Sequence, residues 1–176
     1  MTRNCLSAAF ALSLCLAALA PAASAAESSI LYNQQTTFCA YPPSSASDDY
    51  IYATSCNPDA PQMWSGEVVA RLTNGTAYMR LRNKFSGLCA DLETASTLAG
   101  VRIVQRACSG STTQQWSTPA YAIYSVPAGV GGPSVQPNVT LVNRFSSRCL
   151  EAPADNSPLR QANCSSSNYQ KWFYAL

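Results

Sequence analysis

The sequence contains no histidine and few charged residues. Its 176 residues include 11 Lys and Arg and 9 Asp and Glu, which give a formal net charge of +2. Without histidine the chain cannot form a Ser-His-Asp or Cys-His catalytic arrangement, and a zinc ion would lack a common ligand. The nearly balanced charge also argues against nucleic acid, which requires a clustered basic face. We therefore expect no metal site, no cofactor and no nucleic-acid partner.

Long apolar runs are also missing, except near the N-terminus. Residues 6–20 form an apolar stretch that follows Arg3 and ends before Pro21, and the small residues Ala23, Ser24 and Ala25 come next. This order is typical of a secretory signal peptide with cleavage after Ala25, and the stretch is short for a membrane span. The sequence predicts a signal peptide at residues 1–25, a secreted mature domain at residues 26–176 and no membrane span.

No part of the mature sequence has the apolar spacing of an amphipathic helix. Residues 78–82 and 139–143 instead alternate apolar and polar side chains, as half-buried strands do. Asn74-Gly75 follows the apolar residues of segment 68–72 and is a hairpin turn signal. These patterns predict an all-β protein.

One sequence pattern occurs three times along the chain. Each tryptophan stands two positions after a glutamine, and each of these glutamines stands six positions after a cysteine. The three sets are Cys56-Gln62-Trp64, Cys108-Gln114-Trp116 and Cys164-Gln170-Trp172. A second cysteine, upstream in each set, is preceded by Asn at six positions and by Ser or Thr at three. These Asn–Cys pairs are Asn33–Cys39, Asn83–Cys89 and Asn143–Cys149. The chain therefore divides into repeats at about 27–74, 75–137 and 138–176.

The repeats predict both the architecture and the disulfides. Three units of about four short strands, with no helices to cover their sheet edges, must close into a barrel with pseudo-threefold symmetry. An even number of cysteines in an exported chain argues for disulfides, and only pairing within each repeat keeps the symmetry. The predicted bonds are Cys39–Cys56, Cys89–Cys108 and Cys149–Cys164. Each would stabilise the fold by roughly 3 kcal/mol.

The threefold Gln-x-Trp motif behind a cysteine pair resembles the ricin-B-like lectin family, and the resemblance spans essentially the whole mature chain. It implies a β-trefoil with one shallow pocket for galactose or a related sugar in each repeat. Members of this family occur alone, as appendages of glycosidases or as receptor-binding parts of toxins. For the motif residues we expect the tryptophans to fill the core and the asparagines to cap turns. The glutamines are expected to fasten backbone groups or to line the pocket edge.

In the resembling family, a carboxylate two residues after the first cysteine accepts hydrogen bonds from sugar hydroxyls. An aromatic ring two residues before the second cysteine stacks on the sugar. No repeat of this chain keeps both groups. The pairs at these positions are Tyr41 and Thr54 in repeat one, Asp91 and Arg106 in repeat two, and Glu151 and Ala162 in repeat three.

Repeat two is the predicted sugar site, with Asp91 and Gln114 as hydrogen-bonding groups and Gln105 or Arg106 contributing from the opposite strand. Asp91 could equally be a turn carboxylate bonded to local backbone. In repeat three, Glu151 and Gln170 are the corresponding candidates.

Repeat one offers tyrosines near its missing ring. Tyr50 and Tyr52 are either a displaced stacking platform or ordinary strand tyrosines.

These features bear on three functions. The leading interpretation is a non-catalytic carbohydrate-binding protein for galactose-type glycans. The alternative is a trefoil that binds a secreted protein partner, as the delivery or accessory subunit of a toxin or glycosidase. An enzyme is disfavoured, because paired acids such as Asp48 and Asp49 are more often solvated than catalytic.

Overall fold

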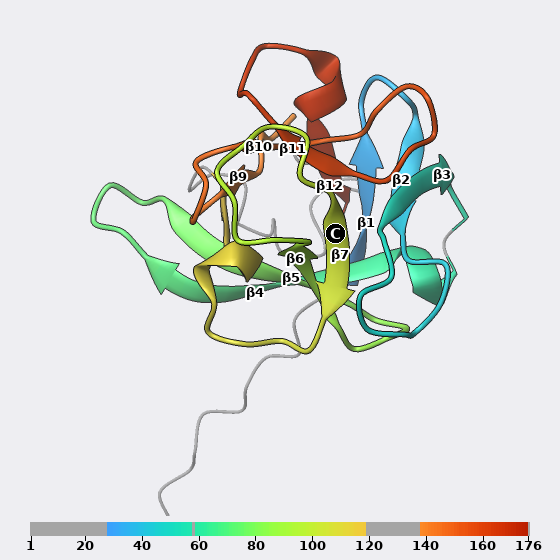
Figure 1. Ribbon diagram of the computed structural model, residues 1–176, viewed down its shortest axis with the longest axis horizontal. Coiled ribbons are helices and arrows are strands. Elements are labelled where there is room, and N and C mark those ends of the chain that lie inside the picture. Colours follow the sequence, from blue (N-terminus) through green and yellow to red (C-terminus); the bar gives the residue numbers. More distant parts are fainter. Residues whose placement is uncertain (1–27, 58, 119–137, 176) are drawn as a thin grey trace, which may run out of the picture.

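The structure is a computed structural model that describes residues 28–57, 59–118 and 138–175. The expected signal peptide lies outside these residues. In the described residues, three successive units, coloured from blue to red in Figure 1, each contain four strands and one 3₁₀ turn. Repeat one contains β1 (Ser28–Asn33), β2 (Phe38–Tyr41), β3 (Tyr52–Ser55), η1 (Ala60–Gln62) and β4 (Met63–Arg71). Repeat two contains β5 (Ala77–Asn83), β6 (Cys89–Leu92), β7 (Ile103–Arg106), η2 (Thr112–Gln114) and β8 (Trp116–Thr118). Repeat three contains β9 (Val142–Asn143), β10 (Cys149–Glu151), β11 (Arg160–Ala162), η4 (Asn168–Gln170) and β12 (Trp172–Ala175).

Six strands close the barrel. Pairing runs from β1 through β4, β5 and β8 to β9, and β12 pairs with β1. An isolated bridge between Val139 and Trp172 completes the ring. The remaining strands form the three hairpins β2–β3, β6–β7 and β10–β11. The described residues contain no α-helix, so the predicted all-β, pseudo-threefold β-trefoil is confirmed.

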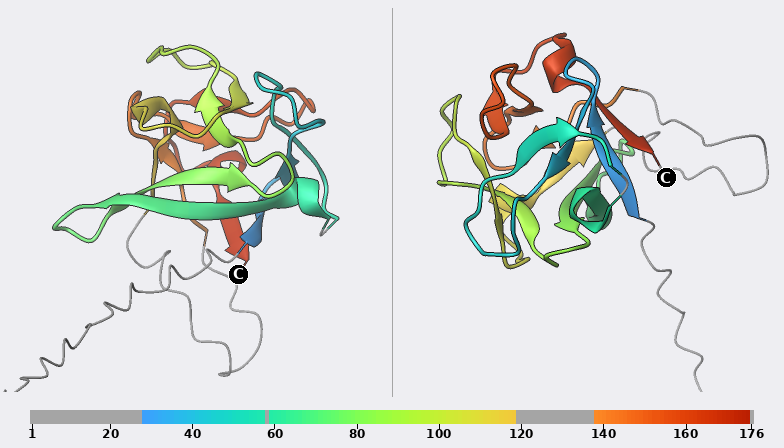
Figure 2. Two further views of the ribbon diagram at one scale, coloured as in Figure 1. Left: turned by 90° about the horizontal axis from the view of Figure 1, so that it is seen from below. Right: turned by 90° about the vertical axis from the view of Figure 1, so that its right-hand side faces the viewer.

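The predicted strand patterns are reflected in side-chain burial. Along β5 every second side chain is buried. Residues 139–143 show the same alternation, although only residues 142 and 143 form a strand. β4 and β5 meet at the Asn74-Gly75 turn, where Gly75 has a φ of 84° that favours glycine. Their hairpin extends beyond the rest of the barrel (Figure 2).

The pseudo-threefold axis is marked by a ring of backbone hydrogen bonds. Ile51, Ile103 and Leu159 each lie five positions before the second cysteine of their repeat. The N–H of Ile51 donates to the carbonyl of Ile103 at 2.9 Å, that of Ile103 to Leu159 at 2.8 Å, and that of Leu159 to Ile51 at 2.7 Å. The hairpins β2–β3, β6–β7 and β10–β11 cap the barrel, and these bonds join the three cap hairpins around one axis.

The tryptophans occupy equivalent core positions. Trp64, Trp116 and Trp172 are fully buried. Each indole N–H donates to the carbonyl of the residue after the first cysteine of its own repeat, and these acceptors are Ala40, Ala90 and Leu150. The ring buries a large apolar surface while its polar atom is satisfied. The expected structural role of the tryptophans is confirmed.

The asparagines link neighbouring repeats. Each Oδ1 accepts from the backbone N–H groups two and three residues later, which fixes the turn after the strand. Each Nδ2 donates at 2.8 Å to the carbonyl before the motif glutamine of the preceding repeat in the ring. These bonds run from Asn33 to Tyr169, from Asn83 to Pro61 and from Asn143 to Thr113. The asparagines therefore cap turns, as expected, and also hold the repeats together.

The three disulfides form within repeats, as predicted: Cys39–Cys56, Cys89–Cys108 and Cys149–Cys164. Among the described residues, no helix is long and apolar enough to cross a membrane.

Candidate functional site

The predicted sugar site of repeat two brings Asp91 and Gln114 together. Asp91 lies on β6, and Gln114 ends η2. The Gln114 amide donates to Asp91 Oδ2 at 3.0 Å, and the residue Asp91 as a whole is only 6% exposed. The other oxygen, Oδ1, is buried and accepts no hydrogen bond from any residue that the structure describes. Asp91 is therefore bonded to a side chain and not to the local backbone, and one of its acceptors remains unused.

All three motif glutamines fasten the loop that follows the second cysteine. Each Oε1 accepts from the backbone N–H just after that cysteine, and each Nε2 donates to the carbonyl just before it. The partners are Asn57 and Ser55 for Gln62, Ser109 and Ala107 for Gln114, and Ser165 and Asn163 for Gln170. Gln114 and Gln170 also donate to the acid of their own repeat. Each of these two glutamines therefore both fastens the loop backbone and belongs to the predicted site.

Arg106 occupies the position at which the resembling family has its aromatic ring. Its guanidinium donates to the carbonyls of Leu92 and Glu93 at 2.9 and 3.1 Å and forms an ion pair with Asp48. It also lies 3.9 Å from Asp91 Oδ2. The hydrogen bond from Arg106 lowers the pKa of the exposed Asp48 carboxyl. Arg106 is therefore held next to Asp91 by two backbone carbonyls and by Asp48.

Gln105 does not face the predicted pocket. Its side chain is fully buried, and Nε2 donates to the carbonyls of Ser44 and Ala46 at 2.8 and 2.7 Å. Both acceptors lie in the β2–β3 loop of repeat one. The side chain therefore fastens a neighbouring loop and does not hydrogen-bond with Asp91.

In repeat three the acid is already paired. Glu151 accepts two hydrogen bonds from Arg160 through Oε1, at 2.9 and 2.7 Å, and one from Gln170 through Oε2 at 2.9 Å. Arg160 was not singled out in the sequence. It stands directly opposite Glu151 in the β10–β11 register, so the hairpin pairing is the signal that would have identified it.

Repeat one has no acid at this place. Tyr41 occupies the acid position, and its ring centroid lies 6.3 Å from that of Tyr52. Thr54 pairs with Cys39 across the β2–β3 hairpin.

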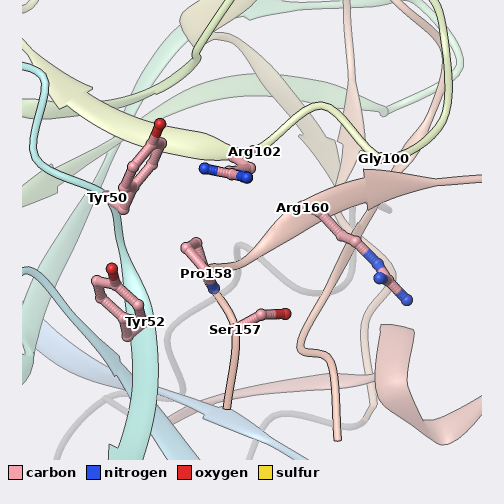
Figure 3. A pocket seen from close by; sticks show the side chains of 7 residues that line it. All are labelled: Tyr50, Tyr52, Gly100, Arg102, Ser157, Pro158 and Arg160. Atoms are coloured by element: carbon pink, nitrogen blue, oxygen red, sulfur yellow. The ribbon is translucent and has the colours of Figure 1, made fainter. Parts of the chain in front are cut away.

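A separate cavity of about 350 Å³ opens beside the pseudo-threefold axis (Figure 3). All three repeats contribute to its wall, and most of the lining residues flank the axial residues Ile51, Ile103 and Leu159. The wall consists of Tyr50, Tyr52, Gly100, Arg102, Ser157, Pro158 and Arg160. Apart from the two tyrosines, sequence reasoning singled out none of these residues.

Within the described part of the chain, no group of His, Cys, Asp and Glu side chains could hold a metal ion. The polar groups of both regions are instead amides, hydroxyls, carboxylates and guanidinium groups. Such groups exchange hydrogen bonds with hydroxyl-rich ligands.

Comparison with known proteins agrees with this architecture. A family model described as "Ricin-type beta-trefoil lectin domain-like" matches residues 60–132. The match covers less than half of the chain. Together with the β-trefoil fold, it confirms the resemblance to ricin-type β-trefoil lectin-like domains that was inferred from the sequence. No curated protein matches the chain in sequence.

Three solved structures illustrate the fold. ThreeFoil, a designed threefold-symmetric protein, is 23% identical with a TM-score of 0.67, over 85% of this chain and 99% of its own. An exo-β-1,3-galactanase from Clostridium thermocellum is 16% identical with a TM-score of 0.70, over 87% of this chain and 31% of its own. The cytolethal distending toxin from Actinobacillus actinomycetemcomitans is 16% identical with a TM-score of 0.58, over 84% of this chain and 90% of the matched chain. At these identities the likeness shows the fold alone.

Proposed function

We propose that this protein is an exported, non-catalytic carbohydrate-binding protein for galactose-type glycans. The observation that carries the proposal is the Asp91–Gln114 pair, which repeat two keeps at the place where the resembling family binds sugar. The match to a lectin-like family supports it, and the three disulfides support export to an oxidising compartment.

In this proposal Asp91 accepts a sugar hydroxyl through its unused Oδ1, while Gln114 holds the carboxylate in place. Arg106 must move aside or contribute its own donors, because its guanidinium lies 3.9 Å from the acid. Moving it would break its bonds to Asp48 and to the carbonyls of Leu92 and Glu93. We therefore expect weak single-site binding, near millimolar or about 4 kcal/mol, which several sites together would strengthen.

A glycan array probed with the purified protein tests this function. Binding to galactose-terminated glycans is expected, and Asp91→Asn tests whether repeat two is the site, because this change removes the charge but keeps the shape. Asp59→Asn is the matched control, since Asp59 is exposed and lies outside the site. An array without any bound glycan would overturn the proposal.

A second candidate function is binding to a secreted protein partner. The acids of repeats two and three are covered or paired by the protein's own arginines, Arg106 and Arg160. In addition, the projecting β4–β5 hairpin carries apolar side chains that are partly exposed, namely Val68, Val69 and Leu72 at 39, 38 and 42%. Exposed apolar side chains that cluster are typical of interaction surfaces. Co-purification with the product of a neighbouring gene, lost when Val68 and Leu72 are changed to Ser, would favour this function.

A further inference from the structure

We propose that a neutral pyranose binds in the cavity beside the pseudo-threefold axis, which we call the axial pocket and define by the seven lining residues above. This inference rests on the proposed carbohydrate-binding function and gives it a location outside the three repeat sites.

The axial pocket exists because one contact between repeats differs from the other two. Gln105 of repeat two donates to carbonyls in the cap loop of repeat one, and Gln161 of repeat three donates to Ser96 and Leu98 in the cap loop of repeat two, at 2.9 and 2.6 Å. Both glutamines lie three positions before the second cysteine of their repeat, and both are fully buried. The equivalent residue of repeat one is Ala53, which cannot make these bonds. The loop of repeat three is therefore not fastened in the same way.

The loop of repeat three is also the shortest. The two cysteines of each disulfide are 17, 19 and 15 positions apart in repeats one, two and three. All three loops keep a positive φ at the position eight before the second cysteine, at Asp48, Gly100 and Asn156, so they enter the cap in the same way. A missing glutamine and a shorter loop together leave space between Tyr52 of repeat one and Pro158 of repeat three.

The wall of the axial pocket has two groups with unused hydrogen-bonding capacity. Arg102 is exposed and stacks over the Tyr50 ring at 5.0 Å from its centroid, and its guanidinium forms no hydrogen bond or ion pair with a described residue. The Tyr52 hydroxyl likewise has no hydrogen-bond partner among the residues described. Stacking holds the planar guanidinium in one orientation, which reduces the entropy lost when it donates to a ligand. Figure 3 shows Arg102 pointing towards Tyr50.

The other polar groups of the wall are already bonded to acids. Arg160 pairs with Glu151, Tyr50 donates to Glu93 at 2.7 Å, and Ser157 donates to Asp155 at 2.6 Å. Three carboxylates thus bond to residues of the wall, against the two arginines that the wall contains, and this balance favours an uncharged ligand over an anion. Two tyrosine rings and Pro158 supply the apolar surface on which the C–H face of a pyranose stacks. The volume suits a small ligand.

The test is an NMR titration of the purified protein with methyl β-galactoside and methyl β-glucoside. We expect the amide signals of Gly100, Arg102 and Ser157 to shift. Arg102→Gln and Tyr52→Ala should each weaken binding about fivefold to tenfold, the loss expected for one hydrogen-bonding or stacking group. Tyr52→Phe removes only the hydroxyl and should weaken it less.

A matched variant serves as the control. Arg144→Gln removes an arginine that also stacks on a tyrosine, Tyr78, but lies outside the axial pocket, and it should leave the affinity unchanged. Shifts confined to the surroundings of Asp91 and Gln114, or an affinity at the axial pocket that is insensitive to Arg102→Gln and Tyr52→Ala, would overturn the axial pocket while leaving the carbohydrate-binding function standing. The absence of shifts with both sugars, together with an empty glycan array, would overturn both.

Discussion

The interior and the cap surface of this trefoil follow the threefold symmetry to different degrees. Inside, the three repeats place a tryptophan, an asparagine and a backbone hydrogen bond at equivalent positions. At the cap surface, two contacts between repeats are fastened by a buried glutamine, whereas the third has Ala53 and opens into the axial pocket. The repeated residues therefore define the fold, while the departures from the repeat create the axial pocket.

The largest expected effect comes from the repeated interior. Trp116→Ala should lower the free energy of unfolding by about 3–5 kcal/mol, because it removes a buried ring and leaves a cavity at the barrel centre. Urea unfolding followed by circular dichroism would measure it.

The same substitution at Trp64 and at Trp172 should cost about as much, since all three indoles are buried and donate to equivalent carbonyls. If one variant lost less than half of the unfolding free energy that the other two lose, the interior would be less symmetric than its contacts indicate.

An intermediate loss of stability is expected at the two contacts between repeats that a buried glutamine fastens. Gln161→Ala should lower the free energy of unfolding by about 1–2 kcal/mol, because it removes two hydrogen bonds to the loop carbonyls of Ser96 and Leu98. Urea unfolding gives the energy, and a crystal structure of the variant should show a second opening beside this loop. Gln105→Ala should lower the free energy of unfolding by a similar amount. If neither variant is destabilised, the glutamines do not explain why two contacts are closed.

The repeated features were predictable from the sequence, and the departures were only partly so. Cysteine spacing gave the disulfides, and the Gln-x-Trp motif gave the positions of the core tryptophans, because both recur at fixed distances. The direction in which the Gln105 side chain points was not predictable, since it depends on the loop of repeat one to which this side chain donates. The Arg160–Glu151 pair likewise depends on hairpin register, and spacing from the cysteines alone does not specify it.

The smallest expected effect distinguishes the two fastened contacts from each other. The contact between repeats one and two includes the Asp48–Arg106 ion pair, whereas Gly100 and Ala162 occupy the equivalent positions between repeats two and three. Arg106 lowers the pKa of Asp48, so Arg106→Gln should raise that pKa back towards its ordinary value, which an NMR titration of the carboxyl carbon would show.

The lowered pKa of Asp48 also determines how the stability of the fold depends on pH. A carboxyl whose pKa is lower in the folded state stabilises the fold above its unfolded pKa and loses that contribution as the pH falls through its folded pKa. Arg106→Gln should therefore be less stable than the parent at neutral pH, and the part of the difference that comes from Asp48 should fade as the pH falls below about 3.9, the ordinary Asp value. Gln161→Ala removes no ion pair, so its stability loss should stay constant over the same range. A pH-independent loss in Arg106→Gln would mean that its carbonyl contacts, and not Asp48, account for what it contributes to this contact.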